Sequence, residues 1–259
     1  MLRSWQETAH LIRELAITDF KLKYQGSVMS YLWSLIKPLA SFAVMYLVFV
    51  KFLNTSIDPA SLFLGIVLWS YFSDFTSSGL KSIVDRGDLI RKIYFPRAII
   101  VVASSLSAFI TLLLNLLAVF VFMAFSGQWP TLSAPLFILL LVELYALALG
   151  ASLILSALYV RFRDISHIWE VCLQILFYSS GILYVLSAVP SAFQSWLAVN
   201  PIVQIVQDSR NVLTPIHVTA SSDVLSGMLA LIPYAIPFVV LGLGIWIFNA
   251  SSKGFAENV

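Results

Sequence analysis

Long apolar runs separated by short polar segments dominate the pattern of this chain. Six runs have the length of a membrane-crossing helix, which needs roughly 20 mainly apolar residues to cross about 30 Å of hydrocarbon. They cover residues 30–50, 61–80, 98–125, 135–160, 165–186 and 228–249. In hydrocarbon a helix satisfies its own backbone polar groups. The pattern therefore predicts an all-α polytopic membrane protein with six transmembrane helices.

The composition agrees with a membrane-embedded chain. Of its 259 residues, 60% are hydrophobic and 11% charged, and the mean hydropathy is +0.93. Soluble domains are about a quarter charged, so this much apolar surface requires lipid. Cys172 is the single cysteine, which excludes an internal disulfide framework.

The distribution of positive charge predicts the orientation. Placing both termini on one side puts 13 of the 15 Lys and Arg residues on that side, and only Lys51 and Arg210 on the other. Cytoplasmic segments carry the excess of Lys and Arg, so we expect cytoplasmic termini. The first 24 residues lack a signal-peptide apolar core, and we expect the first run to act as the retained insertion signal.

Three segments outside the runs have patterns of their own. Residues 5–24 read as an amphipathic helix lying in the membrane interface, and residues 81–97 form a charged, half-apolar cytoplasmic segment. In the outer segment 187–227, two short apolar pieces at 192–199 and 202–212 predict a re-entrant or interfacial helical hairpin. We expect one domain over 1–259, divided into 1–29 (interface helix), 30–249 (six-span bundle, including 81–97 and 187–227) and 250–259 (cytoplasmic tail).

Motifs for soluble catalysis are missing from the sequence. There is no G-x-x-x-x-G-K-[ST] phosphate loop, so we expect no ATP hydrolysis by this chain alone. No Cys or His spacing predicts a metal site, and His167-x-x-Glu170 is too common a pattern to indicate catalysis. We therefore predict no catalytic residue, no metal and no cofactor in this chain.

Polar side chains inside the runs are either interhelical hydrogen-bonding groups or functional groups. The fifth run carries the longest such stripe, at helical spacing. Its members are His167, Glu170, Gln174, Tyr178, Gly181 and Tyr184. The stripe indicates either a tight helix interface or the wall of a polar passage. The candidate pore and substrate contacts are Trp33, Gln174, Tyr178 and Tyr184.

Four segments together resemble one family. Residues 88–97, D-L-I-R-K-I-Y-F-P-R, are similar to the L-I-K-K-x-x-F-P-R signature of permease subunits of ABC exporters that move polysaccharides and teichoic acids. Residues 30–39 resemble their first-span L-W-x-x-x-x-P-L segment, with Ser-Tyr in place of Leu-Gly before it. Residues 155–165 match L-S-x-x-x-V-x-F-R-D-I, and Asn200-Pro201 through Arg210 resembles the outer N-P…R element.

This resemblance implies a partner and a cargo. Family permeases form homodimers and pair with two copies of a separate cytoplasmic ATPase, which binds ATP and Mg. The cargo is a lipid-linked glycan of O-antigen, teichoic acid, capsule or galactan type, exported across the bacterial plasma membrane. Membrane lipids are the other expected contact, and no nucleic acid is expected.

The resemblance also implies roles for individual residues. The ATPase-coupling segment would include Asp88, Leu89, Ile90, Arg91, Lys92, Tyr94, Phe95, Pro96 and Arg97, with Leu89, Ile90 and Ile93 on the docking side. The interface helix would contribute Arg13, Glu14, Phe20 and Lys21. The outer gate would contain Asn200, Pro201 and Arg210. Arg161, Arg163 and Asp164 would form the inner mouth or meet carrier phosphates, or else anchor lipid headgroups.

Two other functions remain open on the sequence. A related permease could export a small hydrophobic drug or antibiotic, which a transport assay with small amphiphiles would reveal. An intramembrane enzyme would need acidic or histidine side chains clustered at one depth, but Asp74, Glu143 and Glu170 are spread over different depths.

Overall fold

The computed structural model describes residues 14, 17–18, 28–55, 57–92, 96–252 and 254–255. Within these residues all regular secondary structure is helical. The long helices are α2 (Val28–Met45), continued by π-helical turns (Tyr46–Phe52), α3 (Pro59–Ser82), α5 (Ala98–Phe125), α6 (Phe137–Arg161), α7 (Ile165–Ser179) and α11 (Ile232–Ser252). The short helices are α4 (Gly87–Lys92), α8 (Ser191–Ala198), α9 (Pro201–Leu213) and α10 (Ser221–Val224). Single 3₁₀ segments lie at Ala134–Leu136, Leu186–Ala188 and Gly227–Leu231.

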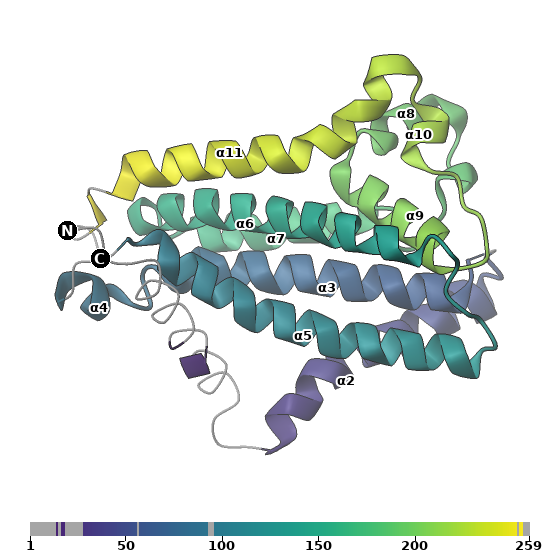
Figure 1. The fold of residues 1–259 in the computed structure, drawn as a ribbon, viewed down its shortest axis with the longest axis horizontal. Coiled ribbons are helices and arrows are strands. Elements are labelled where there is room, and N and C mark those ends of the chain that lie inside the picture. Colours follow the sequence, from purple (N-terminus) through teal and green to yellow (C-terminus); the bar gives the residue numbers. More distant parts are fainter. Residues whose placement is uncertain are drawn as a thin grey trace.

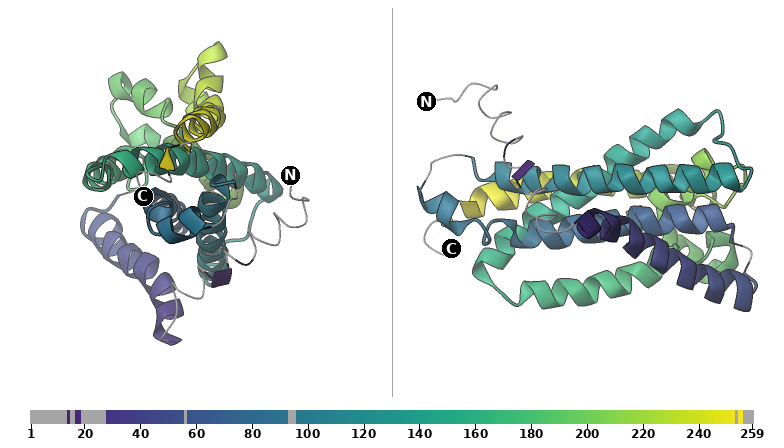
Figure 2. Two further views of the ribbon diagram at one scale, coloured as in Figure 1. Left: turned by 90° about the vertical axis from the view of Figure 1, so that its left-hand side faces the viewer. Right: turned by 90° about the horizontal axis from the view of Figure 1, so that it is seen from below.

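The long helices form an elongated bundle with two different ends. Helices α3, α5, α6 and α11 run side by side along its length (Figure 1). Helix α4 and the C-terminal end of α11 lie at one end, which we call the α4 end. Helices α8, α9 and α10 gather at the opposite end, the α9 end (Figure 1). The views in Figure 2 show α2 standing away from α6 and α11, so it covers only one side of the bundle.

Helix α3 is the centre of the bundle and packs against both α5 and α6. Phe63, Leu64 and Phe75 on this helix are buried. Its start is well defined, because the Asp58 carboxylate accepts a hydrogen bond from the Ser61 amide at 2.9 Å and Pro59 is the first helical residue. An acidic N-cap and a proline at the first position both favour helix initiation.

Two glycines set the distance between α6 and α11. A Cβ on Gly150 would lie 2.6 Å from the Cα of Leu241, and a Cβ on Gly244 would lie 2.5 Å from the Gly150 carbonyl oxygen. The two backbones are therefore in direct contact. Small residues at a helix crossing allow this close packing in membranes, where dispersion rather than the hydrophobic effect holds helices together.

Four described helical segments are long and apolar enough to cross a membrane. They are Trp33–Phe52, Ala98–Phe125, Ala134–Arg161 and Gly227–Ser252. These match the first, third, fourth and sixth predicted runs. Helix α3 occupies the second run and has 24 residues, but Ser, Asp and Lys residues along one side lower its hydropathy.

The fifth run differs from its prediction. We expected a helix over residues 165–186, whereas α7 ends at Ser179 after 15 residues. At 1.5 Å per residue, this helix is about 22 Å long. Gly181 takes a positive φ of 62°, which ends the helix. Gly181 and Tyr184 therefore lie beyond the helix and do not continue its polar stripe.

The two short helices α8 and α9 form where the sequence predicts them. Helices α8 and α9 correspond to the expected pieces 192–199 and 202–212. Several other predicted residues lie outside the described residues. These are Arg13, Phe20 and Lys21 of the interface helix, and Ile93, Tyr94 and Phe95 of the coupling segment.

Candidate functional site

The uncovered side of the central helix α3 is polar. Apart from this side, α3 is enclosed by apolar neighbours. Ser70 and Ser73 are half-buried, and the exposed residues that continue this side are Asp74, Ser77, Ser78 and Lys81. Their spacing of three and four residues places them along one stripe of the helix. A polar stripe therefore runs along the helix that is otherwise the most enclosed in the bundle.

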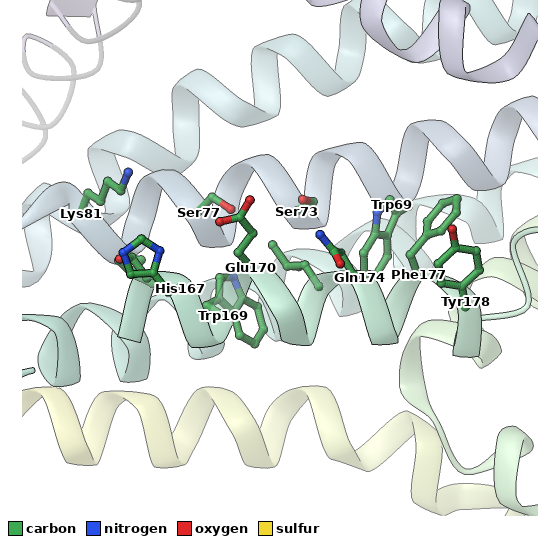
Figure 3. A pocket seen from close by; sticks show the side chains of 13 residues that line it. Trp69, Ser73, Ser77, Lys81, His167, Trp169, Glu170, Gln174, Phe177 and Tyr178 are labelled. Carbon is green, nitrogen blue, oxygen red and sulfur yellow. The ribbon is translucent and has the colours of Figure 1, made fainter. Parts of the chain in front are cut away.

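A groove of about 590 Å³ lies between this stripe and α7. Helix α3 contributes Trp69, Ser73, Ser77 and Lys81, and α7 contributes His167, Glu170, Gln174, Phe177 and Tyr178 (Figure 3). The indole N–H of Trp169 donates to the Thr76 hydroxyl at 3.1 Å. This hydrogen bond fixes α7 against α3 and so sets the shape of the groove.

A second groove, of about 520 Å³, lies between α3 and α2. Helix α2 contributes Trp33, Ser34, Lys37 and Ser41 to its lining. Trp69, Ser73 and Phe177 line both grooves. The two grooves are therefore continuous, and we call the combined surface of α2, α3 and α7 the polar–aromatic face.

Three of the four candidate substrate residues meet on this face. Trp33 is 55% exposed and Tyr178 is 66% exposed, and Gln174 lies one turn before Tyr178. The fourth candidate, Tyr184, was misplaced by the prediction, because it follows the end of α7. The polar stripe by which α3 lines the grooves was not predicted. The helical spacing of Ser70, Ser73, Ser77 and Lys81 could have indicated it.

Two further polar residues inside the long helices have identified partners. The Asn115 amide of α5 donates to the Ser34 carbonyl of α2 at 3.4 Å and to the Thr111 carbonyl at 3.0 Å. Asn115 therefore links two helices. Glu143 of α6 accepts a hydrogen bond from Gln204 of α9 at 3.2 Å.

Arg210 of α9 is a fully buried cation held by backbone carbonyls. Its side chain is 0% exposed. One terminal nitrogen, Nη1, donates to the Gly181 carbonyl at 2.9 Å and to the Tyr184 carbonyl at 3.3 Å, and Nη2 donates to the Ile182 carbonyl at 2.7 Å. These carbonyls belong to the segment directly after α7. Arg210 therefore satisfies the backbone groups that the early end of that helix leaves without helical partners.

The same guanidinium also binds the start of α3. Its Nε donates to the Ser61 carbonyl at 3.2 Å, and a Cβ added to Gly65 would lie 3.2 Å from Nη2. Arg210 consequently joins α9, the segment after α7 and the first turn of α3. Planar guanidinium groups are suited to such sites, because they present five donors in a fixed arrangement.

The other two predicted gate residues define the start of α9. The Asn200 side-chain oxygen accepts from the Ile202 amide at 2.9 Å, and Pro201 is the first residue of the helix. The N-P…R element is thus the capped start of α9 followed by a buried arginine that binds backbone carbonyls. In the described structure none of these three side chains forms an exposed gate surface by itself.

The α4 end holds the predicted coupling segment. Asp88 and Pro96 are exposed, whereas Ile90 is only 7% exposed and packs with Ile83 and Ile99. Ile90 therefore packs within this chain, and its role in docking stays a prediction. Arg97 directly precedes α5, and its guanidinium lies 5.9 Å from the Phe255 ring centroid.

The candidate inner-mouth residues are also at the α4 end. Arg161 ends α6, and Arg163 and Asp164 connect it to α7. All three are exposed. The Arg163 guanidinium lies 5.3 Å from the ring centroid of Tyr159, a distance suited to a cation–π contact. These residues therefore place a charged group next to the end of the α3–α7 groove that contains Lys81 and His167.

Comparison with known proteins identifies similar chains. Residues 10–214 match the family described as ABC-2 type transporter. Over its full length, the chain is 27% identical to the O-antigen export system permease protein RfbA of Myxococcus xanthus, covering 99% of that protein. An RfbA protein of Klebsiella pneumoniae is 27% identical over 92% of this chain and 91% of its own length.

We predict that Arg210→Met destabilises the protein strongly. The substitution keeps an apolar stem of similar length but leaves several buried carbonyls without donors, each at a cost of about 1–3 kcal/mol. The melting temperature in detergent should fall by several degrees. Lys51→Met, which removes an exposed cation near the same end, is the control and should leave it nearly unchanged. Equal melting temperatures for the two variants would contradict the anchoring role.

Proposed function

Because this chain belongs to the ABC-2 type transporter family as a membrane permease subunit, we propose that it exports a lipid-linked polysaccharide across the bacterial plasma membrane. The observation that carries this proposal is the polar–aromatic face of α2, α3 and α7. The relatives named as O-antigen export permeases support the choice of a glycan. O-antigen, teichoic acid, capsule and galactan chains share the chemistry that this face would recognise.

The side chains of the face suit a sugar polymer. Hydroxyl and amide groups such as those of Ser73, Ser77 and Gln174 can exchange hydrogen bonds with sugar hydroxyls. The rings of Trp33 and Tyr178 offer flat surfaces for the apolar faces of sugar rings. Contacts of this kind are weak individually, which allows a long chain to move past them.

The same face argues for a second copy of the chain. A lysine or a carboxylate turned toward lipid costs roughly 2.5–3.5 kcal/mol at the membrane centre, so Asp74 and its neighbours should face water or protein. Two copies placed with these faces opposed would enclose a polar passage. We therefore propose a homodimer with six crossings per chain, in which α3 is one crossing and α7 together with the segment that follows it is another. Helices α8 and α9 would re-enter from the outer side.

Energy would come from a separate ATPase at the α4 end. The sequence contains no phosphate-binding loop, so we propose that two cytoplasmic ATPase subunits bind ATP and Mg. Helix α4 would contact the ATPase through Asp88 and its neighbours, and Pro96 and Arg97, which lead into α5, would pass the motion on to that helix. The N-terminal interface helix would provide a second contact, and both termini would be cytoplasmic.

The exposed charges between α6 and α7 would then lie at the inner mouth. Arg161 and Arg163 can donate to the phosphates of a lipid carrier, because guanidinium groups bind phosphate through paired hydrogen bonds. Their position beside the α3–α7 groove supports this role over simple anchoring to headgroups. Export of a small hydrophobic drug is the second candidate function, but the serine and lysine side chains that line both grooves disfavour a purely apolar cargo.

We predict that the double variant Ser77→Leu/Gln174→Leu lowers export while leaving membrane insertion intact. Each lost hydrogen bond is worth about 0.5–1.5 kcal/mol, so two together correspond to roughly a tenfold effect. Surface glycan and retained intracellular glycan would be measured in a deletion strain carrying each variant. Val171→Leu, on α7 outside the groove, is the control. Unchanged surface glycan in the double variant would refute the proposed passage.

A second prediction concerns ATPase docking. Asp88→Arg reverses an exposed charge on α4 and should abolish co-purification of the ATPase, with the permease itself still folded. Ser195→Arg introduces the same side chain on exposed α8 at the α9 end, and it should retain the ATPase. If Asp88→Arg retained the ATPase as fully as Ser195→Arg, docking through α4 would be wrong.

A further inference from the structure

A cluster of polar side chains joins three helices near the α9 end. The Gln204 amide nitrogen of α9 donates to Glu143 of α6 at 3.2 Å and to Asp208 of α9 at 2.9 Å. The Tyr234 hydroxyl of α11 donates to the same Asp208 oxygen at 2.7 Å. Two carboxylates from different helices therefore share one amide nitrogen.

The cluster lacks one hydrogen-bond donor. Gln204 is 0% exposed, and its side-chain oxygen has no hydrogen-bond partner. Both amide hydrogens are used by the carboxylates, and the tyrosine hydroxyl is used by Asp208. A buried amide oxygen without a donor costs about 1–3 kcal/mol. The cluster formed by these side chains therefore holds more hydrogen-bond acceptors than donors.

The cluster also lacks a positive charge. Among the described residues, no Lys or Arg side chain pairs with Glu143 or Asp208. Arg210 lies on the same helix, but its guanidinium bonds are directed to the carbonyls of residues 61, 181, 182 and 184. A further charge that acts on Asp208 is Asp223, an exposed carboxylate of α10 that adds negative potential. Two adjacent carboxylates cannot easily both ionise in such surroundings.

We propose that Glu143 and Asp208 form a proton-binding site that holds one proton per chain. Uptake of a proton from solvent forms one O–H bond on one carboxylate and leaves the other ionised, so the charge of the pair falls from −2 to −1. The proton turns one acceptor oxygen of this acceptor-rich cluster into a donor, while the Gln204 N–H groups keep their places beside both side chains. The same proton thus supplies the missing donor and removes one of two repelling charges.

The bound proton stabilises the packing of α9 against α6 and α11. With the proton in place, hydrogen bonds hold α9 to α6 through Glu143 and to α11 through Tyr234. Without it, the two carboxylates repel each other across the contact between α6 and α9. Burial raises the pKa of Asp208 above its ordinary value, while hydrogen bonds from Gln204 and Tyr234 act against this. This proton-binding site belongs to the chain itself and does not depend on which cargo the chain moves.

The test is infrared spectroscopy of the purified full chain in lipid nanodiscs. At neutral pH the wild type should show the C=O band of a protonated carboxyl group, shifted in D₂O and lost as pH rises. Glu143→Gln and Asp208→Asn should each abolish this band. Asp85→Asn, which removes an exposed carboxylate at the α4 end, should leave it unchanged.

The stability of the same samples gives an independent readout. The folded state would bind more protons than the unfolded state, so stability is greatest below the ordinary carboxyl pKa of about 4 and falls as pH rises through the raised value. The melting temperature of the wild type should follow this course, and both amide variants should lack this dependence.

Three results would overturn the proposal. The first is a wild type without the protonated-carboxyl band at neutral pH, and the second is a band that persists in both amide variants. The third is a missing band together with a melting temperature raised by added Na⁺ or Ca²⁺, which would assign the site to a metal cation. If both variants failed to fold, loss of the wild-type band on raising the pH would support the proposal, and a pH-independent band would overturn it.

Discussion

The buried guanidinium of Arg210 is the interaction on which the α9 end of this protein depends. A helix that stops early exposes backbone carbonyls, and hydrocarbon offers them no alternative partner. Arg210 supplies donors to the carbonyls of Gly181, Ile182 and Tyr184, and to Ser61 at the start of α3. The fold can therefore end α7 before it reaches full membrane thickness and still place α8 and α9 against the bundle. The short α7 and the layer formed by α8 and α9 both depend on this one satisfied cation.

The other long helices divide their surfaces between packing and an uncovered polar side. Helices α6 and α11 touch through Gly150 and Gly244, so no groove fits between them at this crossing. The central helix α3 is enclosed by apolar side chains everywhere except along its serine-rich stripe. Since α2 and α7 flank that stripe without covering it, the stripe stays open on a single chain. This is the physical reason to expect a second copy, and it explains why the face combines hydroxyl groups with tryptophan and tyrosine.

Much of this architecture could be predicted from the sequence, because hydropathy and helical spacing are local properties. Four of the six runs are found as candidate spans, and the positions of α8 and α9 were predicted from their prolines and apolar spacing. The end of α7 could not be predicted, because it depends on the partnership between Gly181 and a distant Arg210. The burial of Ile90 within the chain could not be predicted for a similar reason: the pattern shows that a residue is apolar, but not which neighbour covers it. The polar stripe of α3 could have been predicted from the spacing of its serines. It did not stand out, because serine is common in membrane helices.

The most direct test of the central claim is photo-crosslinking from the polar–aromatic face in intact cells. A photoreactive phenylalanine analogue in place of Tyr178 would be irradiated in a strain that produces its surface glycan, with the same analogue at exposed Trp246 of α11 as the control. The account predicts that position 178 forms adducts both with lipid-linked glycan and with a second copy of the chain, and that position 246 forms neither glycan adduct nor dimer. Identical lipid-only adducts at both positions would contradict it.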